Sequence, residues 1–210
     1  MAITSIRGFN DILPGPSGQW RWIEESAFSL FALYGFAEIR VPVVEKTELF
    51  CRSIGETTDI VEKEMYTFPD RRGDSMTLRP EGTASVVRAY IERKLYTAPV
   101  AKLCYSGPMF RYERPQKGRY RQFYQIGAEV LGDPSPGADA ETLEMLMRYF
   151  ADLGVKGAEL KINSLGCPEC RPAYKERLLE FLKSKADALC ENCKRRIGAN
   201  PLRALDCKSP

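Results

Sequence analysis

The stretch from residue 102 to residue 131 constrains the fold more than any other part of the chain. Residues 102–113 and 119–131 have the pattern of two long strands, and Pro115 and Gly118 between them favour a turn. We therefore expect a long antiparallel hairpin. Predicted strands outnumber the helices that could connect parallel strands. This favours an α+β fold with a largely antiparallel sheet flanked by helices over a doubly wound α/β fold.

The rest of the chain predicts helices and short strands around this hairpin. One helix is expected to begin at an N-cap, Ser17, and to end at Gly35. Further helices are predicted at 83–94, 139–153, 172–185 and 188–197. Strands are predicted at 37–41, 65–68, 75–78 and 159–163. Neither a G-x-G-x-x-G nor a P-loop pattern is present, so any nucleotide must be bound by a different kind of motif.

The composition is that of a globular domain, with 44% hydrophobic and 28% charged residues. No apolar run approaches the roughly 20 residues of a membrane helix, and the N-terminus lacks the apolar core of a signal peptide. We therefore expect a cytoplasmic protein without a membrane partner. The chain has no histidine, which excludes histidine as a general base or metal ligand. The net charge of +3 is too small to indicate nucleic-acid binding by itself.

Side chains of one parity share a face of a strand, and the odd positions of residues 119–131 have an unusual composition. Up to residue 129 they are Arg119, Arg121, Phe123, Gln125, Gly127 and Glu129. On the first strand, the odd positions end with Arg111 and Glu113. Such a face suits a ligand with phosphates, a flat ring and a polar head. The alternative is an exposed hairpin whose charges form salt bridges.

Seven cysteines without an export signal favour metal binding or burial over disulfides. Cys167 and Cys170 are separated by nineteen residues from Cys190 and Cys193, a spacing that matches a zinc site with four thiolate ligands. The helix predicted between the pairs would span about 21 Å, so they can meet only if the chain folds back after it. Cys207 could also supply a ligand. The alternative is a set of reduced thiols, and Cys51 and Cys104 have the pattern of buried ones.

Several segments resemble class II aminoacyl-tRNA synthetases. Phe-Arg-Tyr-Glu at 110–113, followed by Arg119-x-x-x-Phe123, resembles motif 2, and residues 35–42 resemble the end of motif 1. Leu-Arg-Pro-Glu-Gly-Thr at 78–83 and the sequence of residues 113–123 narrow the resemblance to the histidine-specific family. It departs at Tyr124, where the family usually has histidine, but position 124 belongs to the other face of the strand.

The resemblance covers essentially the whole chain. It implies that residues 1–210 are the N-terminal part of a bacterial-type class II catalytic domain, with motif 1 at about 17–42 and motif 2 at about 102–131. Motif 3, the histidine signature and the anticodon-binding domain are not found. The sheet is therefore expected to be incomplete at its C-terminal side, and this fragment is expected to be inactive alone.

The resemblance also implies roles for particular residues. Those expected to bind histidine are Glu81, Thr83, Arg111, Gln125 and Glu129. Those expected to bind ATP are Arg111, Glu113, Arg119 and Phe123, with Arg111 also catalytic. Contacts to the tRNA acceptor stem are expected from Arg114, Gln116 and Lys117. Gly127 would leave room for the ring of the substrate.

The implied function is ligation of L-histidine to tRNA(His) in a homodimer, with ATP and Mg²⁺ and with Zn²⁺ as a possible structural ion. Two alternatives remain. One is the synthetase-like regulatory subunit of ATP phosphoribosyltransferase, which shares the fold without aminoacylation. The other is a zinc-stabilised module that binds RNA or another protein, which would account for the cysteines but not for the odd-numbered face.

Overall fold

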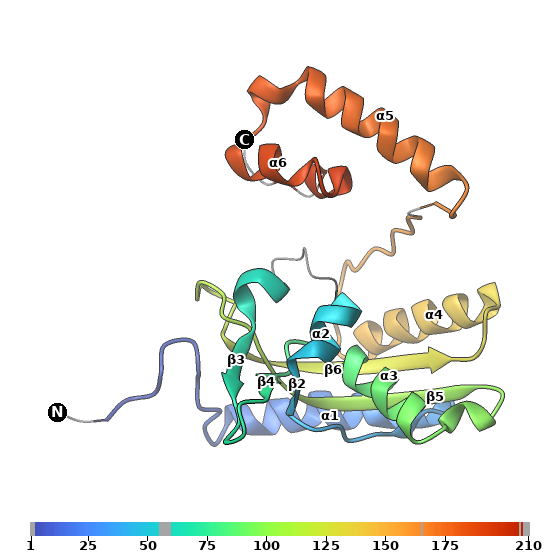
Figure 1. The fold of residues 1–210 in the computed structure, drawn as a ribbon. Coiled ribbons are helices and arrows are strands. Elements are labelled where there is room, and N and C mark those ends of the chain that lie inside the picture. Colours follow the sequence, from blue (N-terminus) through green and yellow to red (C-terminus); the bar gives the residue numbers. More distant parts are fainter. Residues whose placement is uncertain (1–2, 55–59, 165, 206, 208–210) are drawn as a thin grey trace. The chain divides into compact units, whose positions relative to one another are not determined.

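The computed structural model of the chain describes residues 3–54, 60–164, 166–205 and 207 (Figure 1). The contacts divide the chain into two compact units, Met1–Ala158 and Glu159–Pro210. None of the described helices is long and apolar enough to cross a membrane.

The first unit is built around the predicted long hairpin. Strand β5 (Ala101–Phe110) pairs antiparallel with β6 (Gln122–Leu131) over ten residues, and the short β1 (Ala37–Glu38) joins β5 in parallel. A second, antiparallel sheet has the order β2-β4-β3, formed by Val44–Lys46, Ser75–Leu78 and Tyr66–Pro69. The predicted α+β fold with a largely antiparallel sheet is thus confirmed.

The register of the hairpin pairs odd positions with odd positions. Leu103 lies opposite Glu129, and Tyr105 lies opposite Gly127. Directly opposed residues in an antiparallel pair project to the same side of the sheet. The odd-numbered residues of the two strands therefore share one face, as their alternation predicts.

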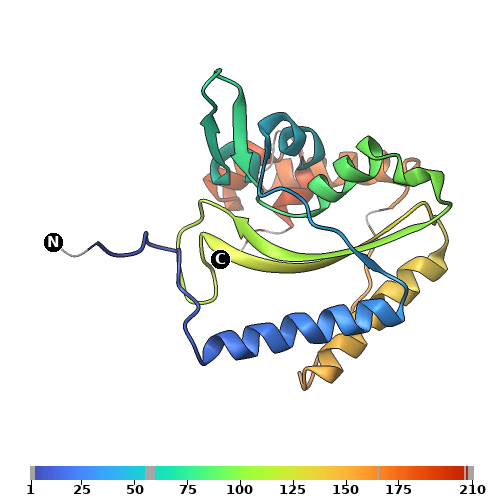
Figure 2. The same ribbon diagram turned by 90° about the horizontal axis from the view of Figure 1, so that it is seen from below.

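The two faces of the hairpin are covered by different helices (Figure 2). Helices α1 (Pro16–Leu33) and α4 (Pro136–Asp152) cover the even-numbered face. Its core is formed by Ala27, Leu30, Phe31, Phe36, Cys104 and Met145, with Ile126, Ala128 and Val130 packed against them. On the odd-numbered face, Val86 of α3 (Thr83–Glu92) packs with Leu103, Tyr105 and Met109. Part of that face is thus core, and the rest carries the polar residues.

The second sheet is braced by hydroxyl groups. Thr77 of β4 is fully buried, and its Oγ1 lies 2.8 Å from that of Thr47 and 3.0 Å from that of Thr67. Thr47 begins α2 (Thr47–Ile54). Neither α2 nor β2 is predicted from the sequence. Strand β2 has three residues, too few to show the alternation of apolar and polar side chains. It is recognised as a strand only by its pairing with β4.

The second unit consists of short helical elements. Helix α5 (Cys170–Ser184) is followed by a 3₁₀ turn at Ala186–Ala188, by α6 (Glu191–Arg196) and by a second 3₁₀ turn at Pro201–Ala204. The strand predicted at 159–163 is absent from the described structure, because these residues have no pairing partner there.

Several predicted boundaries also differ. Ser17 is not the N-cap of α1, since the helix begins at Pro16 and Gly15 precedes it with φ 96°. Proline suits the first helical position because its missing N–H has no helical partner there. The strand predicted at 37–41 keeps its pairing only at 37–38. Strands β5 and β6 stop short of residues 111–121, so this segment forms a longer connection than predicted.

A buried arginine connects the second sheet to the hairpin. Arg79 is only 4% exposed, and its Nε and Nη1 donate to the carbonyl oxygens of Pro108 and Val41, both at 2.9 Å. Its own carbonyl accepts a hydrogen bond from the backbone N–H of Phe110. Burial lowers the pKa of the guanidinium, and carbonyl oxygens replace the water that it loses. Arg79 thereby holds β4 against the end of β5.

We predict that Arg79→Met lowers the free energy of unfolding of the first unit by about 3 kcal/mol, because it leaves two partly buried carbonyl oxygens without donors. Both tryptophans lie in α1, so their fluorescence during urea unfolding reports this unit. The matched control is Arg71→Met at an exposed turn, for which a change within about 0.5 kcal/mol is expected. Equal effects of the two substitutions would contradict the role given to Arg79.

Candidate active site

Glu129 and Thr83, both predicted to bind histidine, lie together on the odd-numbered face. Thr83 is the first residue of α3, and its Oγ1 donates to Glu129 Oε1 at 2.7 Å. The same carboxylate oxygen lies 3.4 Å from the hydroxyl of Tyr105, a longer contact than the first. Tyr105 was missed in the sequence, although its odd position on the neighbouring strand was a signal. Helix α3 and both strands thus meet at one carboxylate.

Glu81, which is also predicted to bind histidine, directs its carboxylate towards the N-terminus of α3. Its two oxygens accept hydrogen bonds from the backbone N–H groups of Thr83 and Ala84, at 2.7 and 2.8 Å. The first N–H groups of a helix have no partner within the helix, so a carboxylate there satisfies them. Glu81 therefore fixes the backbone of the residue that contacts Glu129.

The ring of Tyr105 occupies the space beside two glycines. A Cβ atom added at Gly82 would lie 2.2 Å from this ring, and one added at Gly127 would lie 2.3 Å from it. The absence of a side chain at Gly127 thus makes room for the protein's own Tyr105 ring. Both glycines serve the close packing of α3 against the hairpin.

The buried Tyr105 is a hydrogen-bond donor at neutral pH. Burial is the main cause that raises its pKa to about 12, and the negative charges of Glu129 and Glu81 act in the same direction. The phenol therefore keeps its proton. The hydroxyl groups of Tyr105 and Thr83 can both donate to the Glu129 carboxylate.

Gln125 has an unused acceptor. Its Oε1 is buried and has no hydrogen-bond partner among the residues that the structure describes. A buried amide oxygen without a donor costs free energy, so it marks a place where a ligand could donate a hydrogen bond. Gln125 lies between Phe123 and Gly127 on the odd-numbered face, two positions from each.

Arg111 and Phe123 lie together at the other end of this face. The guanidinium carbon of Arg111 is 5.0 Å from the centre of the Phe123 ring, within the range of a cation–π contact. Arg111 Nε donates to the carbonyl oxygen of Pro80 at 2.8 Å. Two separate parts of the chain thus hold the guanidinium beside an aromatic ring.

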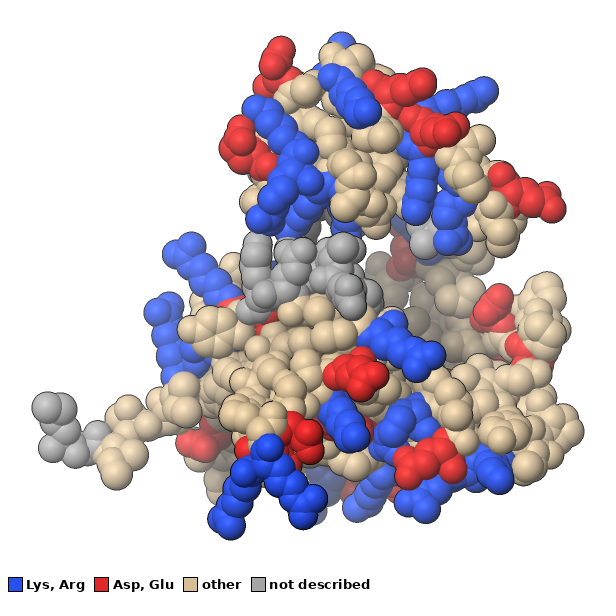
Figure 3. All heavy atoms as spheres, in the orientation of Figure 1, with Lys and Arg blue, Asp and Glu red and all other residues tan. Residues whose placement is uncertain are grey.

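Arg119 and Glu113 form an ion pair in the segment that connects β5 to β6. Arg119 Nε lies 2.6 Å from Glu113 Oε2, with the arginine side chain 59% exposed and the glutamate side chain 11% exposed. The tip of this segment is a tight turn between Gln116 and Arg119. The side chains expected to contact tRNA, those of Arg114, Gln116 and Lys117, are exposed. On the face drawn in Figure 3, basic and acidic side chains are interspersed.

The base of the connecting segment is an aromatic cluster that was not predicted. Phe9 packs against Tyr66 and Phe110, and Tyr66 packs against Tyr112. The guanidinium carbon of Arg121 lies 4.1 Å from the centre of the Tyr112 ring. Arg121, counted above among the ligand-facing cations, supports the segment instead.

The five C-terminal cysteines fall into two groups. Cys167 and Cys170 form a pair whose Sγ atoms lie 3.4 Å apart. Cys190 and Cys193 cluster with Cys207. The four cysteines predicted from their spacing are therefore not brought together in the described structure.

Comparisons with known proteins agree on one family. Residues 8–204 match the family described as histidyl-tRNA synthetase. The histidine–tRNA ligase of Geobacter sulfurreducens is 66% identical over 208 residues, which are 99% of this chain and 50% of that protein. The ligase of Syntrophotalea carbinolica is 63% identical over 211 residues, again 50% of that protein. The chain thus spans about half the length of the curated relatives that it matches.

The fold of the chain is also similar to those of solved structures. Apo histidyl-tRNA synthetase of S. aureus has a TM-score of 0.76 and 40% sequence identity, covering 100% of this chain and 49% of that chain. A Bacillus halodurans protein described as an ATP phosphoribosyltransferase regulatory subunit/histidyl-tRNA synthetase has a TM-score of 0.65 and 19% identity, over 92% of this chain and 54% of that one. This second likeness shows a shared fold only.

We predict that Gly127→Ala destabilises the first unit by about 2–3 kcal/mol, because the new methyl group would displace the Tyr105 ring. Gly18→Ala, at a helical position with open space around it, is the matched control and should be neutral or slightly stabilising. In a double-mutant cycle, Tyr105→Ala should remove most of the cost of Gly127→Ala. Additive effects in that cycle would contradict the packing described for the two residues.

We also predict a pH dependence for Tyr105. Its pKa is about 12 in the folded chain, against about 10 for an ordinary tyrosine. Its contribution to stability is complete below pH 10 and is lost as the pH rises towards 12, because the unfolded chain releases the proton first. The stability difference between the wild type and Tyr105→Phe should therefore shrink by about 1 kcal/mol between about pH 9.5 and 11. A constant difference over that range in urea unfolding would contradict the prediction.

Proposed function

This chain belongs to the histidyl-tRNA synthetase family, and from that premise we propose that its odd-numbered face binds L-histidine and ATP for the ligation of histidine to tRNA(His). The observation that carries the proposal is the order of side chains along β6. Phe123, Gln125 and Glu129 follow one another on a single face and project to the same side as Arg111 and Thr83. The six steps along the strand from Phe123 to Glu129 span about 20 Å, which suits an amino acid joined to a nucleotide.

Histidine occupies the end of the face at Glu129. The carboxylate accepts a hydrogen bond from an imidazole N–H and thereby selects the histidine side chain. The unused oxygen of Gln125 accepts a hydrogen bond from the substrate, and Glu81 and Thr83 bind the α-amino group. Because Glu129 is held by α3 and by β5, little reordering is required when the ligand binds.

ATP occupies the other end. The ring of Phe123 stacks on the adenine, with Glu113 near the same base. Arg111 lies beside Phe123 and binds the α-phosphate together with the histidine carboxylate. Arg119 is mostly exposed in its ion pair with Glu113. Because most of its side chain is in solvent, Arg119 can turn from the carboxylate towards the distal phosphates.

The reaction is an in-line displacement at the α-phosphorus. A carboxylate oxygen of histidine forms the new P–O bond as the bond to pyrophosphate breaks, which yields histidyl-adenylate. The terminal ribose hydroxyl of the tRNA then attacks the carbonyl carbon, and AMP leaves. Arg111 neutralises the charge that develops on the phosphate oxygens. Mg²⁺ bound to the phosphates of ATP supplies further neutralisation.

We propose that tRNA(His) approaches the connecting segment. Arg114, Gln116 and Lys117 are exposed at its tip, where a phosphate backbone could reach them. The aromatic cluster at its base holds the tip in place. By likeness to the family, residues 17–42 and 102–131 act as motifs 1 and 2 of a class II catalytic domain, and the full-length protein acts in the cytoplasm as a homodimer.

A chimera tests the proposal. This chain would replace the matching 208 residues of the Geobacter sulfurreducens ligase, which are 66% identical to it. We predict histidine-dependent ATP–pyrophosphate exchange by the chimera and none above background by the chain alone. Within the chimera, Glu129→Gln should raise the KM for histidine by about 10- to 100-fold, the loss of one charge-assisted hydrogen bond, and should leave the KM for ATP within about twofold.

Glu176→Gln, at an exposed position of α5, is the matched control and should change neither constant. A folded chimera that binds histidine without exchange would favour a regulatory subunit. Equal increases of both KM values in Glu129→Gln would contradict the assignment of histidine to that end of the face.

A further inference from the structure

The unit Glu159–Pro210 has very little apolar core of its own. Its buried residues, among those described, are Leu182, Cys193, Ile197 and Pro201. Large apolar side chains elsewhere in the unit stay exposed, with Phe181 at 59% and Leu205 at 60%. A unit of about fifty residues buries little apolar surface and is often stabilised by a crosslink or a metal.

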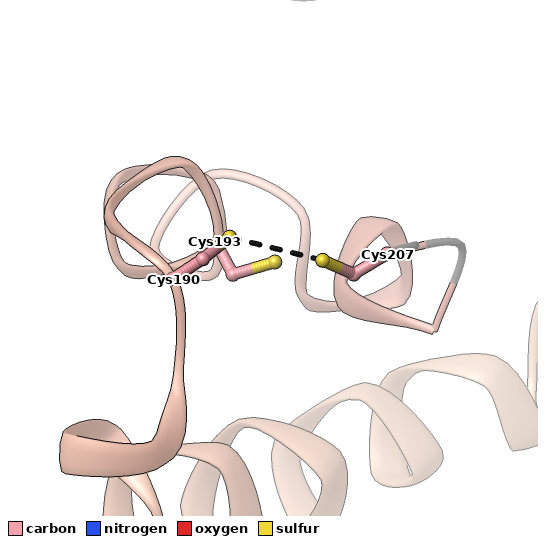
Figure 4. A group of neighbouring side chains, drawn as sticks. All are labelled: Cys190, Cys193 and Cys207. Atoms are coloured by element: carbon pink, nitrogen blue, oxygen red, sulfur yellow. Dashed lines mark hydrogen bonds between the residues drawn. The ribbon is translucent and has the colours of Figure 1, made fainter. Parts of the chain in front are cut away.

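Three thiols lie together in this unit (Figure 4). The Sγ atoms of Cys190, Cys193 and Cys207 are all within 4.8 Å of one another. Cys190 immediately precedes α6, and Cys193 lies in its first turn. Cys207 comes from the chain beyond the 3₁₀ turn Pro201–Ala204. The cluster therefore brings the start of α6 together with the segment that follows the second 3₁₀ turn.

Backbone hydrogen bonds fix the main chain at the three cysteines. The carbonyl of Cys190 accepts from the N–H of Lys194, and that of Cys193 accepts from the N–H of Ile197, both at 3.0 Å. The N–H of Cys207 donates to the carbonyl of Ala204 at 3.2 Å. The ligand atoms are thus arranged by the fold around them.

We propose that Cys190, Cys193 and Cys207 are the protein ligands of one structural zinc ion. Zinc–sulfur bonds of about 2.3 Å at tetrahedral angles place two sulfur atoms about 3.8 Å apart. The Sγ atoms of Cys190 and Cys207 are 3.7 Å apart, which agrees with that value. Three thiolates would supply three of the four ligands that a tetrahedral zinc ion takes.

Binding converts three thiols into thiolates and releases three protons for each zinc ion. Three thiolates and one divalent cation sum to a charge of −1. Lys194, Arg195 and Arg196 follow in the last turn of α6, where Lys194 pairs with Glu191. A disulfide would use only two of the three sulfurs, whereas a metal ion accounts for all of them.

The zinc content of the purified chain tests this site. After expression and purification with added zinc, elemental analysis should find about one zinc ion for each chain. Cys190→Ser, Cys193→Ser and Cys207→Ser should each lower this content at least fivefold. Cys51→Ser, Cys167→Ser and Cys170→Ser should keep it, because none of these residues belongs to the cluster.

Cobalt substitution keeps the test decisive if a serine variant fails to fold. Wild-type chain reconstituted with Co²⁺ should show thiolate-to-cobalt charge-transfer absorption of three-sulfur intensity and the ligand-field bands of a tetrahedral site. Two results would overturn the proposal. One is no bound metal, with every cysteine reacting freely with a thiol reagent. The other is zinc lost from Cys167→Ser and Cys170→Ser but retained in Cys207→Ser.

Discussion

The antiparallel pairing of β5 with β6 is the interaction on which the rest of the first unit depends. Ten residue pairs place odd positions opposite odd positions, so each face of the hairpin collects one set of side chains. The even set supplies Cys104, Ile126, Ala128 and Val130 to the core that α1 and α4 cover. The odd set is free to carry Phe123, Gln125 and Glu129. A shift of one residue on either strand would exchange the two sets and would bury charge in the core.

The two ends of the proposed site differ in rigidity. At the end that contains Glu129, the Tyr105 ring is packed between Gly82 and Gly127, and Thr83 is held by the helix that it begins. At the other end, Arg119 belongs to a connecting segment, and its side chain is 59% exposed where it pairs with Glu113. This division suits a fixed pocket for an amino acid and an adjustable clamp for phosphates and tRNA.

The second unit differs from the first in what it buries. The first unit buries two apolar clusters, whereas residues 159–210 leave Phe181 and Leu205 exposed and gather three thiols instead. Binding energy from an ion can replace the burial that so short a segment cannot provide. The proposed zinc site would therefore be structural and would need no part in the reaction.

Local patterns in the sequence determined the α+β class, the hairpin, the face shared by Phe123 and Glu129, and the helices α1, α3, α4 and α5 to within a few residues. These features repeat every 2 or 3.6 residues, so a short window of sequence records them. Only the tertiary structure decided that Tyr105 fills the space beside Gly127, that Arg121 supports an aromatic cluster, and that Cys190 and Cys193 meet Cys207 instead of Cys167 and Cys170. It also decided that residues 159–163 form no strand in the described structure. Each of these outcomes depends on contact with a residue outside the local stretch of sequence. The spacing of residues within a short window does not specify that contact.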